Sequence, residues 1–449
     1  MSSNSSITAT NGAAIYGNTA SASGGGGYIS GQFSAYGETS DIYNNCAPNG
    51  GGFHVPGGTL YLEEVDLLSN QAAATDGKGG GIYVTNGGDV HLNDSVAVGT
   101  SLFAASQTAY DGAGIYADNS TVSLDDVNLG YNLATRYGGG LYLGNNSTLQ
   151  AVDTDLGHAI SFIVTLQWGN SANYGGGLYA DSSTVDFSGN IATNVANYSG
   201  GGIHAANSTL NIMDATIGPV GSALGNRMGT SGYYGAGMYL NSSQATLNNT
   251  VVTSNTFEST SNNYGGGAYV TGNSTLVLTH TSEIAYHDLS AANFGRGAGV
   301  YLNGSSLTLD DSSIHHNIAS RDGGGVRMLG TSTFNMRNNA HIRDNQALSE
   351  EGGGIAAFNT PDINIENATL KDNTAGADGG AVYIEGGTLD FTGGWTLREN
   401  TAGGNGGAIA VTGTADPRFS AGSDSLAYAN DAQGGNGGMI YLGSNATAE

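Results

Sequence analysis

The stretch that decides the fold is GGGIYVTN, residues 79–86, which returns as GGGLYLGN (138–145), GGGLYADS (175–182), GGGIHAAN (200–207) and GAGVYLNG (297–304). A single glycine loop of this kind would suggest a phosphate-binding site. The first glycines of these motifs, from Gly50 to Gly437, instead follow one another about every 30 residues. A fixed period of that length is typical of a repeat architecture, so the glycines indicate structure rather than one ligand site.

Each period contains short segments in which apolar and polar residues alternate. In residues 297–322, Val300 and Leu302 share one side and Tyr301 takes the other, and Leu307 and Leu309 alternate in the same way. Alternation with a period of two predicts strands, and no helical period persists. Three strands and three corners in each period predict one coil of a parallel β-helix, with coils stacked about 4.8 Å apart.

The fold class expected is therefore all-β, with about 15 coils of roughly 30 residues each and almost no helix. We expect residues 1–449 to form a single β-helix. Residues 1–49 would be irregular first coils, and residues 50–449 regular repeats with longer loops in 79–111, 138–174 and 200–234.

Charge excludes several kinds of partner. The chain has 11 Lys and Arg against 37 Asp and Glu, a formal net charge of −26, which disfavours nucleic acid and polyanionic substrates as partners unless Lys and Arg cluster. The single cysteine, Cys46, allows no internal disulfide. No apolar run reaches 18 residues, so we expect no direct membrane insertion. The opening MSSNSSITAT lacks the features of a signal peptide, so either Met1 precedes a mature segment or export uses another route.

An asparagine recurs in the third segment of the period, framed by an apolar residue three positions earlier. Asparagine tolerates the left-handed conformation, and its amide bonds well to backbone groups. We expect these residues to stack at one corner as a structural amide ladder rather than to bind a ligand. The predicted members are Asn70, Asn132, Asn190, Asn317, Asn345, Asn373 and Asn400.

Two late copies of the repeat, LKDNTAGADGGAVY (370–383) and LRENTAGGNGGAIA (397–410), carry the pairing of GGA[ILV] with FxxN. In this the chain resembles the passenger domains of polymorphic outer-membrane proteins, a group of autotransporters, from about residue 42 to the end. Most copies read GGG or GAG rather than GGA, and Phe187 is the clear case in which the first FxxN position is Phe. The resemblance implies a right-handed parallel β-helix that is displayed at the cell surface and is often adhesive.

The residue after the glycine–apolar step is usually aromatic. Alternation places it opposite the core, where the rings would stack as an exposed ladder. Such a ladder either stabilises the sheet by cross-strand stacking or offers a flat platform to sugar rings or a partner chain. The candidate platform residues are Tyr83, Tyr116, Tyr142, Tyr179, Tyr239, Tyr269, Tyr301 and Tyr383.

Other polar clusters give weaker signals. The corners at Asp125–Asp126 and Asp310–Asp311 could hold Ca²⁺ through oxygen ligands, although solvated turns explain them as well. We expect no other metal and no cofactor. The histidines at 315, 316 and 341, near Arg321 and Arg343, are compatible with zinc or acid–base chemistry, but a polar outer face explains them better. We assign no catalytic residue.

Three functions fit these patterns. The first is a non-enzymatic extracellular or cell-surface module, structural or adhesive, that presents a platform to glycans or to a host or neighbouring cell. The alternative is a polysaccharide-degrading enzyme of the pectate-lyase-like β-helix kind, because one fold serves many functions. The third is a fibre, in which copies of the chain or flanking β-helix domains stack end to end through unpaired strand edges.

Overall fold

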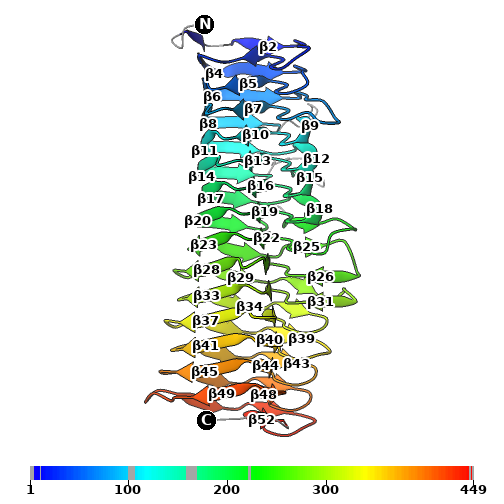
Figure 1. Ribbon diagram of the computed structural model, residues 1–449, viewed down its shortest axis with the longest axis vertical. Helices are drawn as coiled ribbons and strands as arrows, with labels where there is room; N and C mark the ends of the chain where they lie inside the picture. Colours follow the sequence, from blue (N-terminus) through cyan, green and yellow to red (C-terminus); the bar gives the residue numbers. More distant parts are fainter. Residues whose placement is uncertain are drawn as a thin grey trace. The chain divides into compact units, whose positions relative to one another are not determined.

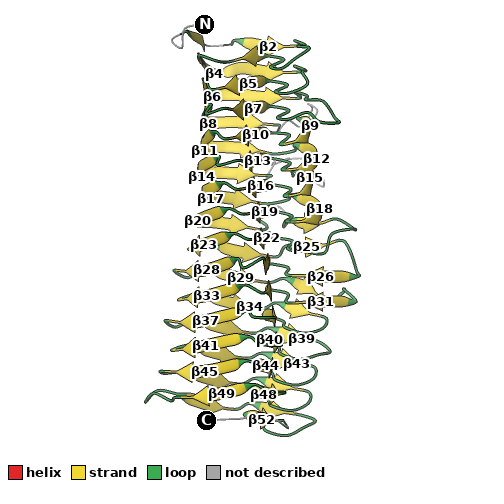
Figure 2. Cartoon of the chain, in the orientation of Figure 1, coloured by secondary structure: helices red, strands yellow, loops and turns green. Residues whose placement is uncertain are grey.

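The computed structural model describes residues 5–10, 12–99, 107–157, 169–220, 224–443 and 446. The chain divides into two compact units, Met1–Gly229 and Thr230–Glu449, and each is described by itself. The described residues form strands and connecting loops, with no helix among them (Figure 2). Strands stack on their equivalents in the neighbouring coils (Figure 1), and the printed pairings are parallel.

In the first unit, the strands that follow the glycine runs form the tyrosine sheet. These are β3 (Gly27–Tyr28), β5 (Phe53–Pro56), β7 (Ile82–Thr85), β10 (Ile115–Asp118), β13 (Leu141–Gly144), β16 (Leu178–Asp181) and β19 (Ile203–Ala206). A broad sheet contains β1 (Ser6–Thr10), β2 (Ala14–Tyr16), β4 (Gln32–Tyr43), β6 (Thr59–Leu68), β8 (Asp89–Val98), β11 (Thr121–Leu129), β14 (Thr148–Leu156), β17 (Thr184–Ile191) and β20 (Thr209–Ile217). A short sheet contains β9 (Thr108–Asp111), β12 (Leu133–Tyr137), β15 (Ser171–Tyr174), β18 (Val195–Ser199) and β21 (Arg227–Met228).

The second unit repeats this plan with shorter strands. Its tyrosine sheet contains β22 (Met238–Asn241), β27 (Ala268–Thr271), β32 (Val300–Asn303), β36 (Val326–Leu329), β40 (Ile355–Phe358), β44 (Val382–Glu385), β48 (Ile409–Thr412) and β52 (Ile440–Leu442). The first half of the broad sheet contains β23 (Gln244–Asn248), β28 (Thr275–Thr279), β33 (Ser306–Asp310), β37 (Thr333–Arg337), β41 (Asp362–Glu366), β45 (Thr388–Thr392) and β49 (Asp416–Phe419).

The remaining strands of the second unit complete each coil. The second half of the broad sheet contains β24 (Val251–Thr253), β29 (Glu283–Ala285), β34 (Ser313–His315), β38 (His341–Arg343), β42 (Thr369–Lys371), β46 (Thr396–Arg398) and β50 (Leu426–Tyr428). The short strands are β25 (Thr256–Phe257), β26 (Asn262–Tyr264), β30 (Asp288–Leu289), β31 (Phe294–Arg296), β35 (Ile318–Ala319), β39 (Gln346–Ala347), β43 (Thr374–Ala375), β47 (Thr401–Ala402) and β51 (Asp431–Ala432).

The core of each unit follows from the alternation in the sequence. In β33, Leu307 and Leu309 are fully buried, and each pairs with a buried residue of the next coil, Phe334 and Met336. Like side chains therefore stack on like ones, and the apolar interior is continuous along the stack of coils within a unit. This arrangement confirms the predicted coil of three strand segments.

The corner between the two halves of the broad sheet differs between the units. In the first unit a single long strand such as β11 passes through the corner, with Asp126 at a φ of 52°. In the second unit the strand is interrupted there, as at Asp311, whose φ is 50°. The backbone bends through a left-handed residue in both cases, and Asp and Asn adopt this conformation more readily than most side chains.

The glycine runs have a steric cause. Gly379 has a φ of +70°, a conformation that L-residues rarely adopt. Its neighbour Gly380 does not have a positive φ, but a Cβ atom there would lie 2.2 Å from the carbonyl oxygen of Gly407 in the next coil. The first glycine turns the chain and the second admits the adjacent backbone, so no ligand is needed to explain the run.

Within the described ranges, no helix is long and apolar enough to cross a membrane. Parts of the three predicted longer loops, namely residues 100–106, 158–168 and 221–223, lie outside the described residues. These parts include most of the apolar segment at 157–170.

Candidate functional site: an aromatic double row and an arginine–carboxylate cluster

The buried amide ladder is a structural feature with complete hydrogen bonding, as Asn345 shows. Its Nδ2 donates to Asn373 Oδ1 at 3.1 Å and to the carbonyl of Ile314 at 3.0 Å. Its Oδ1 accepts from the backbone N–H of Asn317 at 3.1 Å and from Asn317 Nδ2 at 3.0 Å. Both donors and both acceptors of the amide are used inside the protein, which leaves none for a ligand.

Each unit has such a ladder column. The predicted members are all buried in them, Asn70 and Asn132 in the first unit and Asn317, Asn345, Asn373 and Asn400 in the second. The columns also contain residues that the sequence analysis missed, which are Asn18, Asn45, Gln107, Asn170, Asn194 and Asn226 in the first unit and Asn255, His287 and Asn430 in the second. Asn45, Asn194, Asn255 and His287 each lie three residues after a buried residue of the broad sheet, as the predicted members do. Gln107, Asn170 and Asn226 follow residues outside the described ranges, and Asn430 follows the exposed Ala427, so the same signal does not mark them.

The prediction for Asn190 was wrong. Asn190 is half-buried in β17 and donates to Asp155 Oδ1 at 2.8 Å, whereas Asn194 fills the ladder position. The two candidates follow two different core residues, Phe187 and Ile191. Ile191 lies at the end of the broad strand, directly before the ladder corner, whereas Phe187 lies one corner earlier. The FxxN frame selected Phe187 and therefore the wrong asparagine.

The predicted tyrosines do form a stacked column on the tyrosine sheet of the first unit. Ring centroids are 4.3 Å apart between Tyr116 and Tyr142, 5.4 Å between Tyr142 and Tyr179, and 4.7 Å between Tyr179 and His204. Tyr83 continues the column, tilted at 5.5 Å from Tyr116. Strand register produces this column, because each tyrosine pairs with its equivalent in the next coil.

The column is much less exposed than predicted. Tyr116 and Tyr179 are buried at 5% and 9% exposure, and Tyr83 and Tyr142 are half-buried. A second row of rings covers part of the column: Tyr137 stacks on Tyr179 at 4.5 Å. Burial raises the pKa of Tyr142 to about 12. Sequence alternation placed these rings outside the core but gave no information about the second row.

The second row comes from the residues near the end of each short-sheet strand, just before the glycine run. Tyr137 and Tyr174 have centroids 5.4 Å apart, and Tyr174 and Tyr198 5.2 Å apart. The tyrosine column and the row of Tyr137, Tyr174 and Tyr198 together form what we call the aromatic double row. Tyr198 is 45% exposed, so the double row is accessible to a ligand along its second row. Arg136 lies over the Tyr137 ring at 4.4 Å and forms an ion pair with the buried Asp111, with Nη2 and Oδ2 2.7 Å apart.

In the second unit the tyrosine column changes composition along its length. Tyr239, Tyr269 and Tyr301 stack in order, with centroids 5.6 and 5.0 Å apart. In the next coil Arg327 occupies the same register position, with its guanidinium 5.4 Å from the Tyr301 ring. Tyr301 and Tyr383 are buried, while Tyr239 and Tyr269 are half-buried.

Arg327 belongs to an arginine–carboxylate cluster that the sequence analysis did not predict. Asp322 Oδ1 lies 2.9 Å from Arg327 Nε, and Asp322 Oδ2 lies 3.1 Å from Arg296 Nε. Glu350 forms an ion pair with Arg321 and lies 3.7 Å from Arg296 Nη2. These residues come from successive coils. Their contacts could be predicted only from the register in which the strands of one coil pair with those of the next.

The two carboxyl groups of this cluster have different proton affinities. Burial raises the pKa of Asp322 to about 7, against the lowering effect of Arg327 and Arg296. Burial also raises the pKa of Glu350, but hydrogen bonds with Arg321 and Asp322 outweigh it, so the pKa is lowered overall. Asp322 is therefore the group that takes up a proton first as the pH falls.

The acidic corners do not meet as a cation site. Asp310 accepts from Asn338 Nδ2 at 2.7 Å and from Arg337 Nε at 2.9 Å, and both bonds lower its pKa. Asp125 and Asp126 are exposed, and Asp126 accepts from Ser95 at 3.0 Å. In the part of the chain that the structure describes, no group of three or more His, Cys, Asp or Glu side chains is arranged to hold a metal.

The histidines form a polar cluster of their own. His315 Nδ1 lies 2.9 Å from His316 Nδ1, and His315 Nε2 lies 3.3 Å from Glu283 Oε2. His341 pairs in register with Ser313, in the coil next to them. Burial, then the charge of Arg343, lowers the pKa of His315. His315 is therefore mainly neutral near pH 7.

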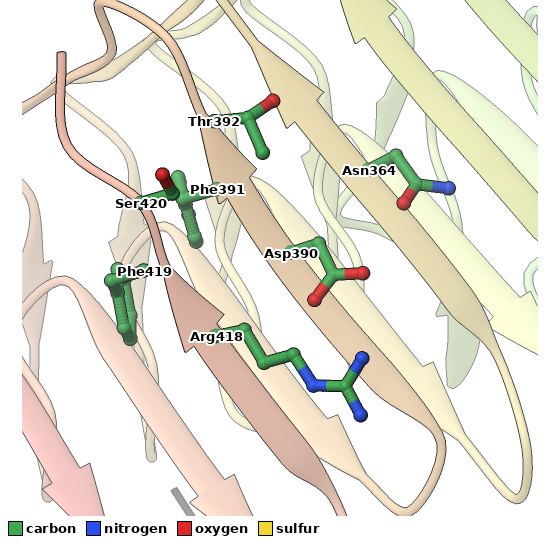
Figure 3. Close-up of a pocket in the computed structure, with 7 residues that line it drawn as sticks. All are labelled: Asn364, Asp390, Phe391, Thr392, Arg418, Phe419 and Ser420. Atoms are coloured by element: carbon green, nitrogen blue, oxygen red, sulfur yellow. The ribbon is translucent and has the colours of Figure 1, made fainter. Parts of the chain in front are cut away.

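A hollow on the broad sheet of the second unit lies apart from these clusters. Figure 3 shows its lining: Asn364, Asp390, Phe391, Thr392, Arg418, Phe419 and Ser420. Its volume is about 350 Å³, and the rings of Phe391 and Phe419, which contribute to its lining, stack at 5.0 Å. Asp390 and Arg418 are register partners on adjacent strands, so one acidic and one basic side chain face the hollow.

Comparison with known proteins bears on the fold. A family profile described as a right handed beta helix region matches residues 236–424, which lie within the second unit. The parallel stacking of coils agrees with this match. The fold is a right-handed parallel β-helix. No curated protein matches the chain at a significant level, so this β-helix assignment carries no activity with it.

Proposed function

We propose that this chain is a non-enzymatic extracellular or cell-surface β-helix module that binds glycans along its aromatic double row. The observation that carries the proposal is the row Tyr137, Tyr174 and Tyr198, in which each ring lies beside the ring of the next coil. Aromatic faces bind the apolar faces of sugar rings. A row with one ring for each coil suits a linear ligand better than a single small molecule.

The surroundings of the row favour a sugar over a charged partner. Arg136 is paired with Asp111, and phenol groups are uncharged at neutral pH because their ordinary pKa is about 10. Burial raises the pKa of the tyrosines in the column further. The row therefore offers rings and hydroxyl groups with little net charge. Hydroxyl-rich ligands match that surface.

The proposal is tested by isothermal titration of the protein with linear neutral oligosaccharides. Tyr198→Ala removes the most exposed ring of the row, and we expect a loss of affinity of about tenfold. Tyr16→Ala is the matched control, because Tyr16 is also exposed in the first unit and stacks on Tyr43 at 4.9 Å, outside the row. Equal losses in both variants, or unchanged binding in Tyr198→Ala, would overturn the proposal.

The same proposal includes attachment at a surface and association between β-helices. The resemblance to autotransporter passengers supports a surface location, and the adhesive role rests on the aromatic double row. The in-register stacking that joins successive coils would equally join a coil of a flanking domain or of a second copy. Sedimentation over a wide concentration range tests this association, which a strictly monomeric result would contradict.

The arginine–carboxylate cluster favours polysaccharide hydrolysis as a second candidate function. Asp322, with a pKa of about 7 beside Tyr301, has the proton affinity of a general acid. Its hydrogen bond with Glu350 brings the two carboxyl groups closer than the roughly 5 Å or more that glycoside hydrolysis requires. Because the two carboxyl groups lie too close together for this reaction, we rank glycan binding above hydrolysis.

The second candidate is tested by the release of reducing ends from a panel of neutral and acidic polysaccharides. Hydrolysis by the native protein that Asp322→Asn abolishes, and that Asp372→Asn preserves, would place the enzyme first. Asp372 is a suitable control because it is half-exposed and pairs with Lys371 at 3.3 Å, outside the cluster. Intact polysaccharides after incubation with the native protein would support the binding role.

A further inference from the structure

Three cations stack in register on the second half of the broad sheet. Arg343 pairs with Lys371, and Lys371 pairs with Arg398, on strands β38, β42 and β46. The chain has only 11 Lys and Arg among 449 residues. Like charges directly opposite one another on neighbouring strands destabilise a sheet, and three occur here in succession.

These cations line a pocket of about 560 Å³, which we call the basic pocket. Its other lining residues are His341, Thr369, Thr396, Leu426 and Tyr428. Tyr428 is the register partner of Arg398 and is 48% exposed, so the row of cations ends on an accessible ring. His341 Nδ1 is buried and has no hydrogen-bond partner among the described residues.

Each cation already has one neighbouring carboxylate. Arg343 pairs with Asp344 at 2.9 Å, Lys371 with Asp372 at 3.3 Å, and Arg398 with Glu399. These acids belong to the left-handed corner residues and do not line the pocket. A guanidinium carries five donors and an ammonium three, so one carboxylate leaves donors available on the pocket side.

We propose that the basic pocket binds an acidic polysaccharide, one carboxylate to each cation, with a sugar ring stacked on Tyr428. The cations repeat once for each coil, about 4.8 Å apart. That spacing suits a linear polymer with a single anionic group on each sugar. Threonine hydroxyls from two of the same strands add hydrogen-bonding groups for the sugar hydroxyls.

The charge of the surroundings distinguishes this ligand from nucleic acid. Each cation is accompanied by a carboxylate, and the whole chain has a net charge of −26. Neighbouring phosphates of one strand of duplex DNA lie about 3.4 Å apart along the axis, which does not match cations that lie about 4.8 Å apart, and the flanking acids repel them as well. A polymer with one carboxylate on each sugar can bring one carboxylate to each cation. This site is separate from the aromatic double row, so it stands or falls independently of the proposed function.

The test is titration of the full chain with polygalacturonate, with uncharged dextran and single-stranded DNA as comparison polymers. We expect the native protein to bind polygalacturonate with an affinity that falls as ionic strength rises. Lys371→Gln, in the middle of the row, is expected to weaken binding about tenfold, and Arg343→Gln or Arg398→Gln by a similar factor. Tyr428→Ala is expected to weaken binding without changing the salt dependence.

Arg337→Gln is the matched control. Arg337 is an exposed arginine of the same unit that pairs with Asp310 at 2.9 Å, so the variant removes the same charge outside the pocket. Its affinity for polygalacturonate should stay within about twofold of the native value. An equal loss in Arg337→Gln, no binding by the native protein, or DNA binding as tight as polygalacturonate binding would each overturn the proposal. Circular dichroism of each variant separates loss of binding from loss of fold.

Discussion

His287 Nδ1 lies 3.0 Å from Asn317 Oδ1, in a column that asparagine occupies in the neighbouring coils. The backbone N–H of His287 donates to the same oxygen at 3.1 Å, and Asn255 Nδ2 lies 3.3 Å from His287 Nε2. An amide nitrogen can only donate, so Nε2 must accept and Nδ1 must carry the proton. The neutral ring thus keeps one donor contact to the coil after it and one acceptor contact to the coil before it, which is half of the bonding of a ladder asparagine such as Asn345.

The first prediction concerns the pH dependence of stability that His287 introduces. Burial lowers its pKa from the ordinary value of 6.5 to about 4. Below pH 6.5 the unfolded chain binds a proton that the folded chain does not, so the free energy of unfolding falls as the pH falls towards 4. From about pH 7.5 to about pH 5.5 this contribution is about 1 kcal/mol.

His287→Asn should remove this acid-dependent loss. Denaturant unfolding of the native protein and the variant at both pH values measures it. If the two proteins lose the same stability on acidification, the assignment of the titration to His287 is wrong.

The second prediction compares two asparagines four residues apart. Asn194→Ala removes donors to Leu156 O and Asn226 Oδ1 and leaves the amide groups of Asn170 without their acceptor. We expect a loss of about 3 kcal/mol or more, because buried polar groups become unsatisfied. Asn190→Ala, which breaks one half-buried bond to Asp155, should cost about 1 kcal/mol or less. Equal values from chemical denaturation would contradict the assignment of the ladder to Asn194.

The third prediction concerns the glycines that admit the adjacent coil. At Gly380 a Cβ atom would lie 2.2 Å from the Gly407 carbonyl and 2.7 Å from the Thr401 nitrogen. Gly380→Ala should therefore destabilise the protein by roughly 1–3 kcal/mol through forced displacement of backbone. Gly394→Ala places its Cβ at ordinary contact distances of 3.5 Å or more and should be close to neutral. Thermal unfolding of the two variants provides the comparison.

The fourth prediction is a pH dependence of the opposite sign at Asp322. Its pKa is raised from 3.8 to about 7 in the folded state, so the folded chain holds a proton that the unfolded chain has released. Stability from this group is present below about pH 4 and is lost as the pH rises towards 7. In Asp322→Asn the free energy of unfolding should fall less between about pH 4 and pH 7 than in the native protein, whether the variant is more or less stable overall. A decline that persists unchanged in the variant would show that Asp322 is not its source.

Much of the fold could be predicted from the sequence because one coil is a local pattern. The glycine spacing sets the register, and the alternation at residues such as Leu307 and Leu309 sets the buried face, which the structure confirms. Asn190 was misplaced because a single frame, an apolar residue followed by asparagine at the third position, occurs at two corners of the same coil. Distinguishing Asn190 from Asn194 requires the position of the strand end.

The candidate sites were harder to predict because they depend on residues from different coils. Tyr137 stacks on Tyr179, which lies one coil beyond Tyr142, the tyrosine that follows Tyr137 in the sequence. No local pattern indicates that contact. The meeting of Asp322 with Arg296 and Arg327 likewise depends on loop lengths between coils. Seven of the nine arginines lie between Arg296 and Arg418 in the sequence, but their positions do not show that two of them would flank one buried carboxylate.

The amide ladder limits how such a chain can change its length. Each asparagine receives bonds from the coil before it and gives them to the coil after it, so removal of one whole period rejoins matching groups. Removal of part of a period would leave donors and acceptors unpaired in the interior. Insertions and deletions should therefore be tolerated when they add or remove whole coils. Duplication of the gene segment for one coil would lengthen the β-helix while the hydrogen bonds of the ladder stay matched.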